Sequence, residues 1–97
     1  MIFKISNEAN NDLENIWLYT FETWSIDQAD RYFNLILDEI EYLSKNPTIG
    51  KDISYIRKGY FRSKVNTHLI FYRNNNDKQE IEIIRILHEQ MDIDSHL

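Results

Sequence analysis

Apolar residues recur every three or four positions along the first half of the chain, which is the spacing of one face of an α-helix. Two such stripes are present: Ala9, Leu13, Ile16, Trp17, Phe21 and Trp24, and then Ala29, Phe33, Ile36, Ile40 and Leu43. Ser6 and Ser25 precede the stripes, where a hydroxyl can cap a helix. Asn46-Pro47 ends the second one, because proline disfavours helical geometry in the residue before it. The very short linker between the stripes predicts an antiparallel helical hairpin.

The remaining segments have the residue types of β-strands. Alternation and β-branched or aromatic side chains predict strands at residues 2–5, 60–65, 68–73 and 80–87, with turns at 66–67 and 74–77. Residues 48–58 are expected to form a loop with little extended structure. The order β-α-α-β-β-β predicts an α+β fold, in which an antiparallel sheet is packed on one face by the N-terminal helical hairpin.

Composition limits the class of protein. The 97 residues are enough for one domain, spanning 1–97, and 42% of them are hydrophobic, which is well above the disordered range. Cysteine is absent, which excludes disulfides and thiolate metal ligands. The chain shows no secretory signal and no apolar run long enough to span a bilayer. We therefore expect a soluble cytoplasmic protein without membrane contact.

The net charge of −5 is unevenly distributed. Residues 1–47 carry −6, residues 48–76 carry +5 and residues 77–97 carry −4. A basic central segment between acidic ones can recruit an acidic partner despite the overall sign. The alternative is that these charges only solvate a sheet face and a loop.

The most specific motifs lie in the last thirty residues: His68-Leu-Ile-Phe-Tyr-Arg73, and Arg85-Ile-Leu-His88 followed by Met91-Asp92. Together with Gly59, they resemble the ParE branch of the RelE/ParE toxin superfamily. Weaker matches to the same family are Ala9, Asp12-Leu13, Ile16 and Tyr19; Trp24, Gln28-Ala29 and Tyr32; and Leu43, Pro47 and Gly50. The resemblance covers nearly the whole chain.

The resemblance implies the toxin of a type II toxin–antitoxin pair, neutralised by a ParD-like antitoxin whose tail folds onto it. ParE toxins poison DNA gyrase, whereas RelE-type relatives cut messenger RNA in the ribosome. Leu69 stands where such nucleases place an arginine, and no tyrosine follows the last strand. The chain is also acidic, while proteins that bind a polyanion tend to be basic. We therefore expect an inhibitor that is not an enzyme, with no catalytic residue, cofactor, metal or direct nucleic-acid contact.

Two alternatives stay open: a ribosome-dependent ribonuclease, and a non-toxic paralogue that acts only in autoregulation of its operon. The candidate residues for binding antitoxin or target are Arg57, Arg62, Lys64, Arg73, Arg85, His88 and Met91. The arginines of the last two strands either pair with Glu80 or Glu82, or join Arg62 and Lys64 in one basic face. The tail 88–97 is expected to engage the target.

The histidines allow a further hypothesis. A helix through the tail would place His88, Asp92 and His96 on one face, a spacing that can hold a divalent metal. We instead expect His88 to hydrogen-bond within the sheet or to pack under the tail. His68 is expected to serve the turn or the sheet.

Overall fold

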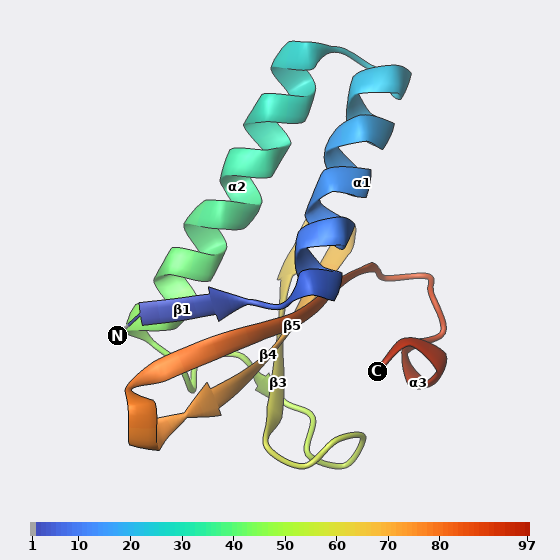
Figure 1. Cartoon of the computed structure of the whole chain (residues 1–97). Helices are drawn as coiled ribbons and strands as arrows, with labels where there is room; N and C mark the ends of the chain where they lie inside the picture. Colours follow the sequence, from blue (N-terminus) through green and yellow to red (C-terminus); the bar gives the residue numbers. More distant parts are fainter. Residues whose placement is uncertain (1) are drawn as a thin grey trace.

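The computed structural model describes residues 2–97, apart from the side chain of Asn76. It contains a short first strand, a helical hairpin and then a strand meander (Figure 1). The elements are β1 (Ile2–Ile5), α1 (Asn7–Thr23), α2 (Ile26–Lys45), β2 (Lys51–Asp52), β3 (Tyr60–Val65), β4 (His68–Asn75), η1 (Asn76–Lys78), β5 (Glu80–His88) and α3 (Ile93–His96). The predicted α+β fold is confirmed, with β2 and α3 as short additions.

Both predicted helix caps are present. The Ser6 hydroxyl accepts a hydrogen bond from the Ala9 amide at 3.0 Å, and it donates one to the Ile84 carbonyl oxygen at 2.8 Å. The Ser25 hydroxyl accepts from the Gln28 amide at 3.1 Å. These bonds satisfy amide groups that have no partner inside the helix. The cap at Ser6 also fastens the start of α1 to the sheet.

The strand order in the sheet is β1-β5-β4-β3-β2. All neighbouring pairs are antiparallel except β1 and β5, which run parallel with Ile2 opposite Glu80 and Ile5 opposite Ile83. The expected antiparallel sheet therefore gains a parallel edge strand. The reason is tertiary: β1 and β5 both run toward the start of α1, where the Ser6 amide bonds to the Ile83 carbonyl oxygen. A two-residue turn, 66–67, joins β3 to β4.

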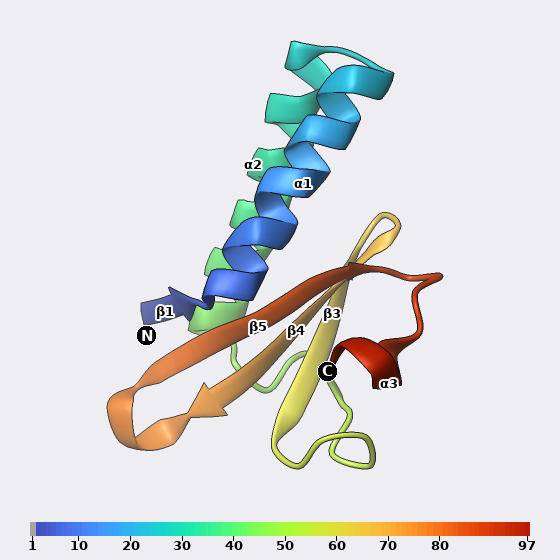
Figure 2. The same ribbon diagram turned by 45° about the vertical axis from the view of Figure 1, so that its right-hand side comes forward.

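Both faces of the sheet are covered, by different parts of the chain (Figures 1 and 2). The helical hairpin packs on one face, over a cluster that includes Ile70, Tyr72, Ile81, Ile83 and Ile86. The loop after β2, which contributes Ile53, and the C-terminal segment pack on the far face, over Leu69, Phe71 and Leu87. Ile93 and Leu97 belong to this second cluster. The tail is thus folded against the sheet.

The apolar stripe of α1 is only partly buried. Ala9 and Leu13 are in the core, whereas Trp24 is 73% exposed and Phe21 is also exposed. The hairpin projects beyond the edge of the sheet, so the last turns of α1 have no sheet beneath them (Figure 1). Trp17 and Phe21 stack on each other there, with ring centroids 5.4 Å apart. Neither helix of the hairpin, nor α3, is long and apolar enough to cross a bilayer.

Candidate functional site

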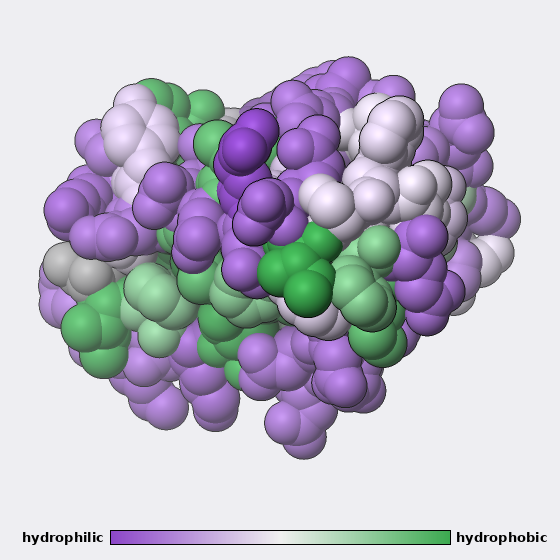
Figure 3. Space-filling view, turned by 90° about the horizontal axis from the view of Figure 1, so that it is seen from above, coloured by the Kyte–Doolittle hydropathy of each residue, from purple (hydrophilic) through white to green (hydrophobic). Residues whose placement is uncertain are grey.

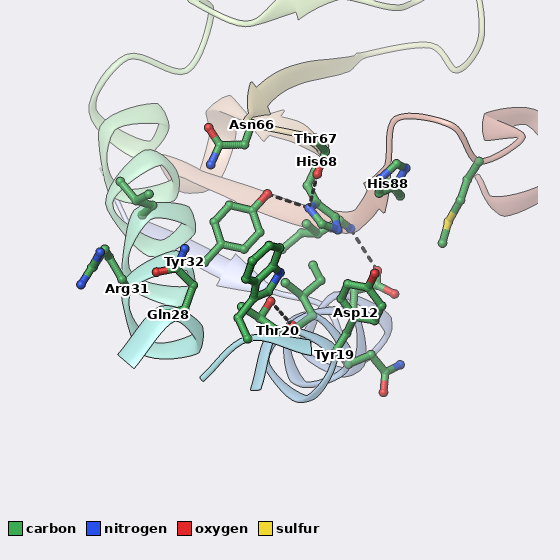
Figure 4. A pocket seen from close by; sticks show the side chains of 16 residues that line it. Asp12, Tyr19, Thr20, Gln28, Arg31, Tyr32, Asn66, Thr67, His68 and His88 are labelled. Atoms are coloured by element: carbon green, nitrogen blue, oxygen red, sulfur yellow. Dashed lines mark hydrogen bonds between the residues drawn. The ribbon is translucent and has the colours of Figure 1, made fainter. Parts of the chain in front are cut away.

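A groove of about 780 Å³ lies between the helical hairpin and the nearby end of the sheet (Figure 4). Tyr19 and Trp24 of α1 line it, as do Arg31 and Leu35 of α2. The sheet contributes the 66–67 turn, His68 and His88, and the tail contributes Met91. Figure 3 looks down on the hairpin and shows apolar side chains exposed among polar ones on that face; within the groove lining, Trp24, Leu35 and Met91 are exposed. The groove therefore combines exposed apolar anchors with polar groups at its rim.

A chain of hydrogen bonds holds the His68 ring against α2 and the 66–67 turn. The Tyr32 hydroxyl donates to the Val65 carbonyl oxygen at 2.9 Å, and its oxygen lies 2.7 Å from Nδ1 of His68. A hydroxyl has one hydrogen, so with that hydrogen directed at Val65, Nδ1 of His68 is the donor in the second bond. The neutral ring then keeps a free lone pair on Nε2. Burial raises the pKa of Tyr32, which keeps its hydroxyl protonated.

His88 stands directly opposite His68 on the neighbouring strand. The two rings meet edge to face with centroids 5.4 Å apart. Nδ1 of His88 accepts a hydrogen bond from the Gln90 amide at 3.2 Å, which places the proton of the neutral ring on Nε2. Burial, and then the neighbouring His88, lower the pKa of His68, while Asp12 and Glu89 oppose that shift. His68 serves the turn and the sheet, as expected. The hydrogen bond of the His88 side chain differs from the expectation, because it is made with the Gln90 amide in the following turn and not with a neighbouring strand.

Arg85 on β5 and Asp12 on α1 form a bidentate ion pair between the two elements. Nε and Nη2 of Arg85 lie 2.8 and 2.9 Å from the two carboxylate oxygens of Asp12. The same carboxylate accepts the Ile86 amide at 3.0 Å, and Nη1 of Arg85 donates to the His96 carbonyl oxygen at 3.3 Å. The hydrogen bonds that Arg85 donates to Asp12 raise the pKa of Arg85. Arg85 thus ties the first helix and the tail to the last strand.

The structure does not bring the seven predicted binding residues together. His88 and Met91 line the groove. Arg85 is paired with Asp12, and Arg73 is paired with Glu82 at 2.5 Å, which is one of the two arrangements left open by the sequence. Arg57 lies on the loop before β3, and Arg62 and Lys64 lie on β3 itself. The basic residues are therefore divided between ion pairs on the last strands and the edge of the sheet.

A second, smaller hollow of about 610 Å³ lies on the far face of the sheet. Its walls are Lys51, Arg62 and Lys64 on the two edge strands, with Leu69 at the base and Ile93 of the tail opposite. Nζ of Lys64 is 2.7 Å from a carboxylate oxygen of Glu89. That contact lowers the pKa of Glu89.

The tail does not form the helix that a metal site would require. A turn follows β5, and α3 begins only at Ile93, with Asp92 as its cap. The side chain of Asp92 accepts from the Ser95 hydroxyl at 2.6 Å. Within residues 2–97, no group of three or more His, Asp or Glu side chains is placed to hold a metal ion.

Sequence reasoning missed most of the groove. Its helical residues Tyr19, Trp24 and Tyr32 match the family patterns, but none of them is among the candidate binding residues of the sequence analysis. The length of the first apolar stripe is a signal that could have identified them, because the stripe continues past the point where the predicted strands could cover it. Arg31, Leu35 and Thr67 carried no sequence signal.

Two solved structures with this fold are described as parts of toxin–antitoxin systems. One is described as the chromosomal ParDE system from P. aeruginosa, with a TM-score of 0.77 and 20% identity over 91% of this chain and 95% of that one. Another is the toxin–antitoxin complex RelBE2 from Mycobacterium tuberculosis, with a TM-score of 0.70 and 19% identity over 90% and 95%. The helical hairpin and the five-stranded sheet of this chain thus have the same fold as these two structures.

Sequence comparison identifies the family within this fold. The family model described as "ParE toxin of type II toxin-antitoxin system, parDE" matches residues 3–93. The chain is 35% identical over 95 residues to Toxin ParE1 of Mycobacterium tuberculosis, covering 98% of this chain and 96% of the relative. It is 34% identical, with the same coverage, to Toxin ParE1 of Caulobacter vibrioides. The chain belongs to the ParE toxin family of type II toxin–antitoxin systems.

Proposed function

We propose that this ParE-type toxin acts in the cytoplasm by binding DNA gyrase and blocking it through surface contact, and that a ParD-like antitoxin neutralises it. The family supports the antitoxin as a partner, since its model is described by the parDE pair. Gyrase is the target that the resemblance to ParE toxins implies. The observation that carries the proposal is the groove, which presents exposed apolar side chains at the end of a rigid hairpin. A binding protein needs such a surface and needs no reactive group.

The groove suits an amphipathic helix of the antitoxin. Trp24, Leu35 and Met91 are exposed apolar residues along it, and they can receive the apolar face of a helix. Arg31 and the free Nε2 of His68 lie beside them and can bind polar groups of the same partner. Large aromatic side chains commonly dominate the energy of such interfaces. Trp24 is therefore the expected anchor.

The strand residues do not support ribonuclease chemistry on the central sheet. Leu69, at the position where nuclease relatives place an arginine, is 4% exposed and lies in the far-face cluster beneath the tail. Arg73 and Arg85 are both engaged by carboxylates. Cleavage of RNA without a metal needs free cations beside the phosphate. Lys51 and Arg62, which form no ion pair among the described residues, lie in the far-face hollow, outside the groove that holds the two histidines. We therefore propose that the toxin is not an enzyme.

Purified toxin and purified gyrase test this function directly. We expect the toxin to inhibit supercoiling of relaxed plasmid at concentrations near that of gyrase, and to cause a DNA-damage response when it is induced in cells. Addition of the protein encoded beside the toxin gene should restore supercoiling. Normal supercoiling together with normal growth would instead indicate a non-toxic member that acts only in autoregulation.

One observation favours a ribonuclease as the second candidate. His68 offers a lone pair at neutral pH and His88 offers an N–H in the same groove, so the pair could serve as base and acid. Mapping of messenger 5′ ends after induction separates the two functions. Cuts at fixed codon positions that vanish in His68→Ala would establish the ribonuclease, while an unchanged transcript pattern supports the inhibitor.

A further inference from the structure

The hollow on the far face of the sheet is the strongest unassigned feature of the molecule. Lys51, Arg62 and Lys64 line it, and the only acidic side chain in its lining is Glu89. Lys51 and Arg62 stand directly opposite each other across β2 and β3, so both side chains project from the same face. Within the described part of the chain, neither of them forms an ion pair. A protein with a net charge of −5 thus keeps unpaired cations together at one place.

The backbone at this place is also open. β2 has two residues and ends its pairing at Lys51 opposite Arg62. The Ile53 amide bonds to the Tyr60 carbonyl oxygen, so the backbone groups of Tyr60 point toward β2. Because that direction repeats every second residue, the amide and carbonyl of Lys64 also point outward, beyond the end of β2. An extended segment can pair with an exposed strand edge of this kind.

The hollow and the groove share a rim. Asn66, Thr67, His88 and Met91 border the groove, while Lys64, Glu89 and Gln90 border the hollow. The two sets alternate along the same short stretches of chain, and the Glu89 amide bonds to the Thr67 carbonyl oxygen at 2.8 Å. A partner leaving the groove at the 66–67 turn therefore reaches the hollow at once. Figure 2 shows this end of β3 beside the turn, with the tail on the far face.

Glu89 occupies the position that an acidic partner would take. Its carboxylate contacts Nζ of Lys64 at 2.7 Å, although 57% of the Lys64 side chain and 35% of the Glu89 side chain remain accessible to solvent. An ion pair this exposed is weak and is easily exchanged for another. The pair leaves Lys51 and Arg62 free to bind further carboxylates.

We propose that the hollow is the second half of the antitoxin-binding surface, and that it binds an extended acidic segment whose carboxylate displaces Glu89 from Lys64. This inference rests on the proposed function, in which a helix of the same antitoxin fills the groove. The groove supplies apolar anchoring and the hollow supplies charge complementarity and strand pairing. Glu89 is thus an internal competitor of the antitoxin.

A labelled peptide tests the hollow without the antitoxin. The probe has roughly twelve residues of alternating Glu and Val, long enough to cross the hollow at ~3.3 Å per residue. A peptide with Gln in place of Glu is its control. Fluorescence anisotropy with the full chain measures binding. We expect the acidic peptide to bind more tightly than the Gln peptide, and to be weakened by added salt.

Substitutions in the toxin then test whether the peptide binds at Arg62 and displaces Glu89. Arg62→Gln should weaken binding of the acidic peptide, whereas Glu89→Gln should tighten it roughly threefold, because the internal competitor is lost. The matched control is Glu41→Gln, which changes the net charge equally but removes an exposed i,i+4 partner of Lys45 on α2. Equal effects of Glu89→Gln and Glu41→Gln would overturn the proposal. It would also fail if random-sequence duplex DNA displaced the peptide and bound more tightly through Arg62.

The protein encoded beside the toxin gene separates this inference from the proposed function. One outcome would refute the hollow alone: the protein binds the wild-type toxin, Trp24→Ala weakens that binding, and Arg62→Gln and Glu89→Gln leave it unchanged. The groove would then keep its assigned role as the antitoxin site. If the protein does not bind at all, the proposed function fails, and the peptide alone decides the hollow. The bipartite surface is supported if the Arg62→Gln toxin still binds this protein but the affinity no longer depends on salt.

Discussion

Arg85 and Asp12 are 73 positions apart in the chain and form a two-pronged ion pair, with N–O distances of 2.8 and 2.9 Å. The side chains are 23% and 12% exposed, so water screens the pair only partly. The same carboxylate satisfies the Ile86 amide beyond the end of β1, where β5 has lost its neighbouring strand. This one contact joins the helical hairpin to the last strand of the sheet.

We expect Asp12→Asn to lower the free energy of unfolding by about 1–3 kcal/mol, because it leaves a half-buried guanidinium without its counter-charge. Urea denaturation followed by circular dichroism measures the change. Glu41→Gln removes an exposed ion pair on α2 and should change stability by less than about 0.5 kcal/mol. Equal losses for the two variants would show that the Arg85 pair has no special role.

His68 should make stability depend on pH. Its pKa is lowered in the folded state from 6.5, so the folded protein takes up this proton less readily than the unfolded chain. The stability it contributes is therefore complete above the unfolded pKa and declines as the pH falls below it. Asp12 and Glu89 oppose the shift without reversing it, and His88 strengthens it.

The measurement is the urea midpoint between about pH 7.5 and about pH 5, a window above the ordinary pKa of Glu89, 4.5, which is lowered further in the fold. We expect the wild-type midpoint to fall across it and the His68→Asn midpoint to fall less. A wild-type midpoint that rises toward acid would contradict the direction of the shift.

Trp24→Ala should weaken antitoxin binding by about 2 kcal/mol without unfolding the protein, because this side chain is mostly exposed at the tip of the hairpin. Isothermal titration calorimetry with the protein encoded beside the toxin gene measures the affinity. Tyr55→Ala, which removes an equally exposed aromatic residue from the loop before β3, is the control. The groove would lose its assigned role if both variants bound as wild type does.

Gly50→Ala tests how closely the loop after α2 packs on the sheet. The Gly50 amide donates to the Tyr72 hydroxyl at 3.0 Å, and a methyl group at Gly50 would overlap that hydroxyl and lie 2.8 Å from the Arg62 carbonyl oxygen. Both neighbours are held in the sheet, so the backbone must move. We expect a loss of about 1–3 kcal/mol in the free energy of unfolding. Gly59→Ala, where a methyl group meets nothing within 4 Å but φ is +82°, should instead show only the cost of backbone strain.

The tail has two separable parts. Ile93 and Leu97 cover the far-face cluster, so a chain ending at Asp92 should be less stable by about 2–4 kcal/mol. Met91 is 46% exposed and lies at the rim of the groove, so Met91→Glu should keep stability and weaken partner binding. Thermal unfolding and gyrase inhibition, measured on both variants, separate the two roles. Loss of stability in Met91→Glu would show that the residue is structural.

The local elements followed from the sequence because their causes are local. Ser6 and Ser25 cap the helices from positions next to the stripes, and Pro47 ends the second helix through its effect on Asn46. The β-rich segments gave the strands, with β4 reaching two residues further than expected, to Asn75. The family motifs identified the toxin family, which the comparisons confirm.

The tertiary structure alone decided which of these residues face solvent and which charges meet. The stripe of α1 looks uniform in sequence, but the sheet ends before Phe21 and Trp24, so the same periodicity yields core at one end and groove at the other. Arg73 forms an ion pair with Glu82 on the neighbouring strand, which is one of the arrangements left open by the sequence, whereas Arg85 forms its ion pair with Asp12 on the first helix. Periodicity specifies which face of an element is apolar, but the length and placement of the partner element determine how much of that face is covered.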